Sequence, residues 1–184
     1  LAIAITTVVF NRSALLFAGE DGVAAVSIIM YLQFLCIGIY FGFSMGLSTP
    51  LGYAYGDRNF SVCRVLEKYA YRFFSIAPII LYGCTYLLAP IGVRFFASPG
   101  STVFDMAVSG LRLYGLGFLC SGINIFAAIR MMTYGKGYIS GMITFLRSFA
   151  LLLLFLTILP RFLELNGIWL AVPGAEILTL IVAL

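Results

Sequence analysis

Long stretches without a charged residue dominate the hydropathy pattern of the chain. No charged residue occurs from Gly22 to Gly56, from Phe73 to Val93 or from Leu113 to Ile129. A helix that crosses the hydrocarbon core of a bilayer needs about 17 to 25 mostly apolar residues, and each stretch is long enough. The pattern therefore predicts a protein that crosses a membrane several times.

Six hydrophobic segments can be delimited, with no room for a soluble domain between them. The expected spans cover about residues 1–18, 23–47, 71–93, 103–132, 138–159 and 168–184. The first and last segments run to the ends of the sequence, so we expect two truncated helices and a longer parent protein. The predicted fold class is an all-α, polytopic transmembrane bundle of six helices.

The composition excludes several kinds of active site. Hydrophobic residues make up 62% of the chain and charged residues only 10%, well below the charged fraction of soluble domains. Histidine is absent, which excludes imidazole bases, Ser-His triads and histidine-ligated metals. The four cysteines and seven acids are scattered, without metal-ligand spacing. We therefore expect no enzyme activity, no metal site and no cofactor.

The basic residues are distributed unequally over the expected loops. One side of the membrane would hold seven of them: Arg58, Arg64, Lys68, Arg72, Arg130, Lys136 and Arg147. The other side would hold only Arg94, Arg112 and Arg161. By the positive-inside rule the side with seven basic residues is cytoplasmic, so both ends of the chain should face the cytoplasm. We expect the protein in the plasma membrane. The net charge of +4 is then a topology signal, and nucleic-acid binding is a poor interpretation of it.

Residues 57–70, between the second and third expected spans, carry basic and apolar positions at helical spacing. This pattern favours a short amphipathic helix that lies on the inner membrane surface. A basic loop without a distinct role is the alternative.

Four glycine and proline positions mark the end of the second expected span. Gly38, Gly42 and Gly46 recur every four residues and clear one helix face, and Pro50 removes a backbone hydrogen bond. Such a helix is either deformable beside a cavity or closely packed against another helix.

Polar residues inside the expected spans are the next candidates, because they are costly in a membrane. Asn11, Gln33 and Asn124 would line a wet cavity or form hydrogen bonds between helices. Arg130 and Arg147 lie near the expected cytoplasmic boundary, where long basic side chains extend to the headgroups. Glu176 is the acid placed well inside a span, and it would titrate protons or pair with a basic residue.

Four motifs follow one another along the chain. Residues 17–26 (FAGEDGVAAV) resemble a GG-x-AVAA turn, and residues 46–59 (GLSTPLGYAYGDRN) resemble a G-x-S-x-x-x-P-x-x-G-x-x-x-G-A-x-N signature. Residues 134–147 carry Gly-Lys followed by Ser140 and Arg147, and residues 167–176 read GIWLAVPGAE. Together they resemble the motifs of MATE (multidrug and toxic compound extrusion) transporters, in which the last one opens the final helix. The order of the motifs places the chain as the C-terminal half, helices seven to twelve.

The resemblance implies one lobe of a two-lobed, twelve-helix transporter with a central cavity. Such transporters export organic, often cationic compounds, driven by inward flow of Na⁺ or H⁺. Some relatives bind the coupling cation with a carboxylate in the seventh or tenth helix, whereas this sequence has Asn11 in the first span and Asn124 in the fourth. The coupling carboxylate is therefore expected in the N-terminal lobe, with Glu176 as a weaker local candidate.

We predict that the protein is a secondary active efflux transporter whose partners are the missing lobe, small organic substrates and membrane lipids. The predicted substrate-pathway residues are Asn11, Gln33, Tyr40, Asn124 and Met132. One alternative is a lipid-linked oligosaccharide flippase, although only Arg12 lies deep in a span to meet a pyrophosphate. Another is a membrane scaffold subunit that transports nothing.

Overall fold

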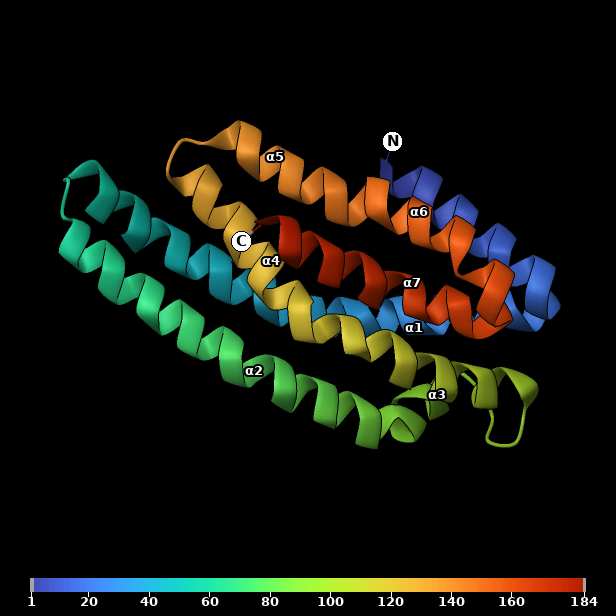
Figure 1. Cartoon of the computed structure of the whole chain (residues 1–184). Coiled ribbons are helices and arrows are strands. Elements are labelled where there is room, and N and C mark those ends of the chain that lie inside the picture. Colours follow the sequence, from blue (N-terminus) through green and yellow to red (C-terminus); the bar gives the residue numbers. More distant parts are fainter. Residues whose placement is uncertain (1, 184) are drawn as a thin grey trace.

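The computed structural model describes residues 2–183, and nearly all of them are helical (Figure 1). The helices are α1 (Ala2–Gly56), α2 (Phe60–Arg94), α3 (Thr102–Tyr114), α4 (Phe118–Thr133), α5 (Gly137–Phe145), α6 (Leu151–Ile158) and α7 (Pro160–Ala183). A 3₁₀ turn at Gly115–Gly117 joins α3 to α4, and a π-helical turn at Leu146–Ala150 joins α5 to α6. The described part contains no strand, so the all-α prediction is confirmed.

Helix α1 is a hairpin of two helices rather than one straight rod. At Gly19 the backbone has φ 62° and ψ −153°, a conformation open essentially to glycine alone. The two halves then run antiparallel (Figure 1), so closely that a Cβ on Gly22 would lie 2.8 Å from the Ala14 carbonyl oxygen. The glycines of the FAGEDG segment therefore make the reversal possible.

A second hairpin forms at the start of α7. Glu164 has φ 50° and ψ −129°, and the chain reverses there between α6 and the rest of α7. A Cβ on Gly167 would lie 2.5 Å from the Leu159 carbonyl oxygen, so this reversal too depends on the close approach that a glycine allows.

The segment expected as a separate surface helix, residues 57–70, is mostly the beginning of α2. Asn59 caps the helix by accepting a hydrogen bond from the Val62 backbone N–H at 3.3 Å. No glycine or proline occurs between Phe60 and Ala77, so nothing interrupts the helix before it enters the apolar region. The amphipathic pattern is present, but it lies on the first turns of a long transmembrane helix.

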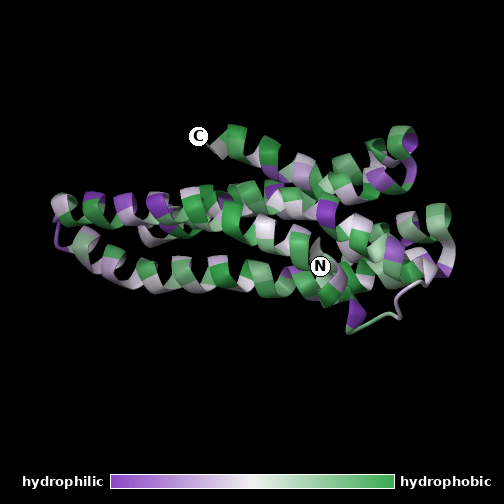
Figure 2. Cartoon of the chain, turned by 90° about the horizontal axis from the view of Figure 1, so that it is seen from below, coloured by the Kyte–Doolittle hydropathy of each residue, from purple (hydrophilic) through white to green (hydrophobic). Residues whose placement is uncertain are grey.

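The two ends of the bundle differ in charge. The α1–α2 and α4–α5 connections lie at the end that we call the basic end, on the left in Figure 1. The reversals at Gly19 and Glu164 and the α2–α3 connection lie at the opposite end. Hydrophilic residues gather at the tip of the basic end, whereas the middle of the bundle is mostly hydrophobic (Figure 2). In the part of the chain that the structure describes, five helical stretches are long and apolar enough to cross a membrane when α1 is counted once. The chain is therefore a multi-pass membrane protein.

The core is built from aromatic side chains where α1, α2 and α4 meet. The Phe74 ring lies 5.6 Å from that of Phe126 and 5.9 Å from that of Tyr40, and all three residues are buried. A Cβ on Gly122 would lie 2.6 Å from the Phe74 ring, so this glycine lets α2 approach α4 closely. This packed core forms one wall of the bundle interior.

Candidate functional site

A small polar cavity lies inside the apolar bundle. Its volume is about 210 Å³, and its walls come from α1, α3, α4, the π-helical turn, α6 and α7. The polar residues that line it are Thr6, Gln33, Tyr114, Ser121, Arg147, Ser148 and Glu176. Ile37, Phe118, Leu152, Val172 and Ala175 complete the wall. Polar groups gathered in an otherwise apolar membrane bundle are typical of a functional site.

Arg147 and Glu176 form an ion pair at this cavity. The Nε atom of Arg147 donates to Oε1 of Glu176 at 3.1 Å, and Nη2 donates to the same oxygen at 2.5 Å. The side chains are only 14% and 6% exposed, respectively. Arg147 belongs to the π-helical turn, a local widening of the helix that often accompanies functional sites.

The inward orientation of Arg147 corrects the expectation that this side chain extends to the headgroups. Arg147 lies ten residues after Gly137, the first residue of α5, which places it about 15 Å along the helix. The side chain turns into the bundle, where the Glu176 carboxylate accepts two hydrogen bonds from the guanidinium.

Asn124 holds the other side of the same carboxylate. Its Nδ2 atom donates to Oε2 of Glu176 at 2.7 Å and to the Glu176 backbone oxygen at 2.9 Å. Asn124 is fully buried, and its Oδ1 atom has no hydrogen-bond partner among the described residues. Of the two roles considered for Glu176, the structure shows pairing with a basic residue, and it leaves a buried acceptor beside that pair.

A hydrogen bond on another wall of the cavity connects α3 to α1. The Tyr114 hydroxyl donates to Oε1 of Gln33. Tyr114 is buried, so this bond fixes the Gln33 amide at the cavity wall. The cavity wall thus brings together Gln33 and Glu176, and Asn124 is hydrogen-bonded to Glu176 behind that wall. The sequence had singled out all three residues.

The other predicted pathway residues lie elsewhere. Tyr40 is fully buried in the aromatic core, where its hydroxyl donates to the Phe118 backbone oxygen at 3.0 Å. Asn11 lines a separate surface depression with Arg12 and Glu20. Met132 is 54% exposed near the basic end of α4. These three residues do not line the polar cavity.

The glycine row of α1 faces open space. Apart from the neighbouring residues and backbone of α1 itself, no described atom lies within 4 Å of the position of a Cβ on Gly38, Gly42 or Gly46. Close packing of this row therefore does not occur within the described residues, and the alternative of a deformable helix stays a prediction. Pro50 lies inside α1, which continues as a helix to Gly56.

Sequence reasoning missed the inward role of Arg147 and the contributions of Thr6, Tyr114 and Ser148 to the cavity. The position of Arg147 deep in a helix was a usable signal, because a charge so far from a helix end needs a partner. Tyr114 gave no such signal, since a tyrosine in an apolar span is equally compatible with lipid contact.

A second polar cluster lies at the basic end and joins α2 to α4. We call Glu67, Tyr71, Arg130 and Tyr134 the basic-end cluster. The Nη1 atom of Arg130 lies 3.4 Å from Oε1 of Glu67 and donates to the Tyr71 hydroxyl at 2.5 Å. The Tyr134 hydroxyl donates to the same Glu67 oxygen at 2.8 Å. Burial and the adjacent Glu67 carboxylate raise the pKa of Tyr134 above its ordinary value.

Several solved transporters have the fold described above. The chain matches an outward-facing structure of a multidrug resistance MATE family transporter of the MOP superfamily, with a TM-score of 0.89 and 22% identity over 99% of this chain. An inward-facing structure of such a transporter matches with a TM-score of 0.91 and 21% identity over the whole chain. A MOP superfamily transporter from Pyrococcus furiosus, described as having a binding pocket of reversed polarity, matches with a TM-score of 0.89 and 22% identity over 99% of this chain.

The chain spans less than half the length of the solved transporters that it matches. The chain covers 41% of the outward-facing transporter and of the Pyrococcus furiosus transporter, and 42% of the inward-facing one, about the share of one lobe. No curated protein matches the chain. The model of the MatE family matches residues 1–159. Because that match covers most of the sequence and the fold agrees with it, the chain belongs to the MatE family of transporters.

Proposed function

We propose that the full-length protein exports organic, often cationic compounds, and that this chain is its C-terminal lobe. The observation that carries the proposal is the polar cavity lined by the Arg147–Glu176 pair, which Asn124 supports from behind, enclosed in a bundle of MatE fold. Buried polar groups inside a membrane-spanning bundle mark the substrate pathway of many transporters. The cavity offers hydrogen-bond donors and acceptors together with apolar walls, a combination that suits amphipathic cations.

The proposed mechanism is alternating access by rocking of two lobes. The fold of this chain agrees about equally well with outward-facing and inward-facing relatives, at TM-scores of 0.89 and 0.91. A lobe that keeps its fold in both states moves as a unit, and the hydrogen bonds around the Glu176 carboxylate would keep α4, the π-helical turn and α7 together during that movement.

The coupling ion, Na⁺ or H⁺, would bind mainly outside this lobe. Both carboxylate oxygens of Glu176 already accept hydrogen bonds from Arg147 and Asn124, so the carboxylate has little capacity left for a cation. We therefore place the coupling carboxylate in the other lobe. In this proposal the basic end faces the cytoplasm, as the distribution of lysine and arginine favours.

The test is efflux of an ethidium-like dye from pump-deficient cells that express the complete parent gene. Na⁺ and H⁺ gradients are collapsed one at a time. The proposal predicts export that stops when one of the gradients is collapsed, which also identifies the coupling ion. Absence of export at confirmed membrane expression would contradict the proposal and make lipid-linked substrates the next candidates.

A further inference from the structure

The outer face of α2 carries three basic side chains at the basic end. Arg64, Lys68 and Arg72 follow one another at four-residue spacing and line one open depression of about 470 Å³. Tyr71, Ser75 and Ile76 line the same depression. We propose that this face binds the phosphate headgroup of an anionic phospholipid, with an acyl chain lying along the apolar continuation of α2.

The length of α2 carries these residues from the headgroup layer into the water beyond it. The helix has 35 residues and is therefore about 52 Å long, whereas the hydrocarbon core of a bilayer is about 30 Å thick, or 20 helical residues. Counted from Arg94 at the opposite end, the core reaches to about residue 75. Arg72 then lies in the headgroup layer, Lys68 lies just outside it, and Arg64 lies one turn farther out, so the two outer side chains reach the headgroups by extending back toward the membrane.

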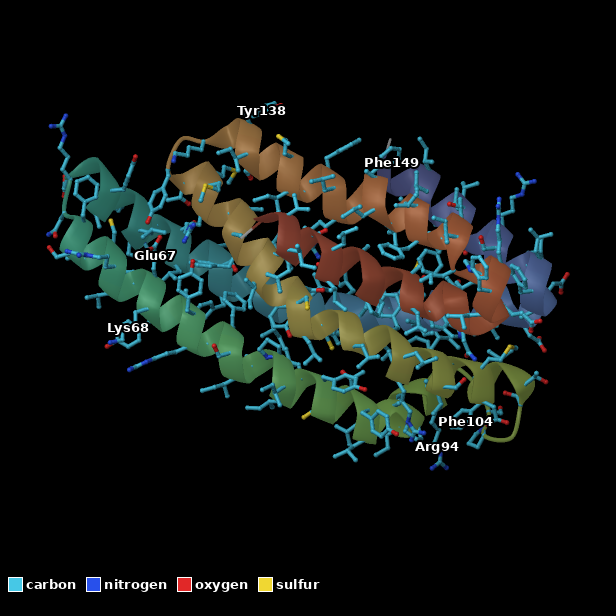
Figure 3. The ribbon with its side chains drawn as sticks, in the orientation of Figure 1. Glu67, Lys68, Arg94, Phe104, Tyr138 and Phe149 are labelled. Carbon is cyan, nitrogen blue, oxygen red and sulfur yellow. The ribbon has the colours of Figure 1, made fainter. Side chains whose placement is uncertain are left out.

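The positive charge of this face is not compensated by the protein. Glu67 also lines the depression, but its carboxylate is held by Arg130 at 3.4 Å and by the Tyr134 hydroxyl at 2.8 Å. Figure 3 shows Glu67 on the bundle side of α2 and Lys68 on its outer side. Arg64, Lys68 and Arg72 form no ion pair with any residue among 2–183. The basic-end cluster thus removes the one negative charge that would otherwise weaken anion binding.

The chemistry of the face matches a lipid better than a free anion. Arginine guanidinium groups bind phosphate oxygens with two parallel hydrogen bonds, and lysine adds a mobile positive charge. Directly below Arg72 on the membrane side, Ile76, Ile79 and Ile80 are exposed and offer an apolar surface to a chain. Basic residues followed along one helix face by apolar ones are complementary to an anionic headgroup followed by its acyl chain.

The proposal is tested by lipid retention, which requires no transport and so is independent of the proposed export. The full-length protein is placed in nanodiscs of equal parts phosphatidylcholine and phosphatidylglycerol, released, and examined by native mass spectrometry for retained phosphatidylglycerol. The variant is Arg64→Gln/Lys68→Gln/Arg72→Gln. A matched control, Arg12→Gln/Arg94→Gln/Arg161→Gln, removes three exposed positive charges from the opposite end.

Each charge removed from the face should weaken phosphatidylglycerol binding about fivefold, since a basic residue near an anionic surface contributes about 1 kcal/mol. The triple variant should therefore lose the retained lipid, and the control should keep it. Equal retention by variant and control would overturn the proposal, as would displacement of the lipid by millimolar inorganic phosphate. If the triple variant fails to insert into the membrane, the single variants Lys68→Gln and Arg94→Gln are compared instead. About fivefold weaker retention of phosphatidylglycerol by Lys68→Gln supports the proposal, and equal retention by the two variants refutes it.

Discussion

The two ion pairs found among residues 2–183 have the same chemistry in different surroundings. Arg147–Glu176 lies inside the bundle, with side chains 14% and 6% exposed, and Asn124 holds the second carboxylate oxygen. Arg130–Glu67 lies at the basic end, with side chains 24% and 21% exposed, and is longer, at 3.4 Å. Water and salt screen the second pair much more than the first. The comparison teaches that the inner pair should contribute more to the stability of the bundle than the outer one, because its partners are more buried.

The largest effect is expected when one partner of the inner pair is removed. Glu176→Leu leaves the Arg147 guanidinium buried without a counter-charge, which costs about 3–5 kcal/mol of stability. Arg147→Met/Glu176→Leu replaces both partners by apolar side chains and should recover most of that loss. Thermal unfolding of the full-length protein in detergent measures both variants. A double variant that is less stable than the single one would contradict this account of the pair.

The next largest effect should come from the Tyr114–Gln33 hydrogen bond on the wall of the same cavity. Tyr114→Phe leaves the Gln33 oxygen without its donor, which should cost about 1–3 kcal/mol. Tyr53→Phe is the matched control, because Tyr53 is 75% exposed on α1. Thermal unfolding should separate the two variants, and equal unfolding temperatures would show that the buried bond does not stabilise the bundle.

A smaller effect is expected at the basic end. Glu67→Gln removes the charge that pairs with Arg130 but keeps a hydrogen-bond acceptor, so it should cost about 0–1 kcal/mol. The difference from the unmodified protein should shrink further in high salt, because both side chains are partly solvated. The same unfolding measurement checks this, and a loss as large as that of Glu176→Leu would invalidate the comparison between the two pairs.

The smallest effect concerns the protonation of Tyr134. Burial and Glu67 raise the pKa of this phenol above its ordinary value of about 10, because both disfavour the phenolate. For a group whose pKa is raised on folding, the stabilisation is complete below the unfolded value and is lost as the pH rises through the folded one. A pH titration of tyrosinate absorbance, taken as the difference between the protein and Tyr134→Phe, should show that Tyr134 ionises at a higher pH than an ordinary tyrosine. Glu67→Gln should lower the pKa of Tyr134. An unchanged Tyr134 titration in this variant would contradict the role given to the Glu67 carboxylate.

The sequence predicted the fold class because its charge-free stretches are long enough to cross a membrane and too long for strands. It also predicted that Glu176 would pair with a basic residue or titrate, and the structure shows the pair. The partner could not be chosen, since Arg147 and Glu176 are 29 residues apart and meet only when α7 folds back at Glu164. Gln33 and Tyr114, 81 residues apart, are a contact of the same kind.

The least successful expectations concerned single residues whose environment depends on neighbouring helices. Tyr40 was predicted as a substrate-pathway residue, and the structure places it against Phe74 in the core. Arg147 had been assigned to the membrane boundary on its loop neighbours, but its side chain turns into the bundle and pairs with Glu176. Residue type and spacing predict which helix face is polar, whereas the partner across the interface is set by tertiary packing.

The central claim is that the polar cavity belongs to the transport pathway and that the basic-end pair does not. The most direct test compares dye efflux by Asn124→Leu and Glu67→Gln in the full-length protein at matched membrane abundance. Asn124→Leu removes a hydrogen bond to a buried carboxylate, so efflux should fall about tenfold or more, whereas Glu67→Gln should stay within about twofold of the unmodified protein. Undiminished efflux by Asn124→Leu would contradict the claim.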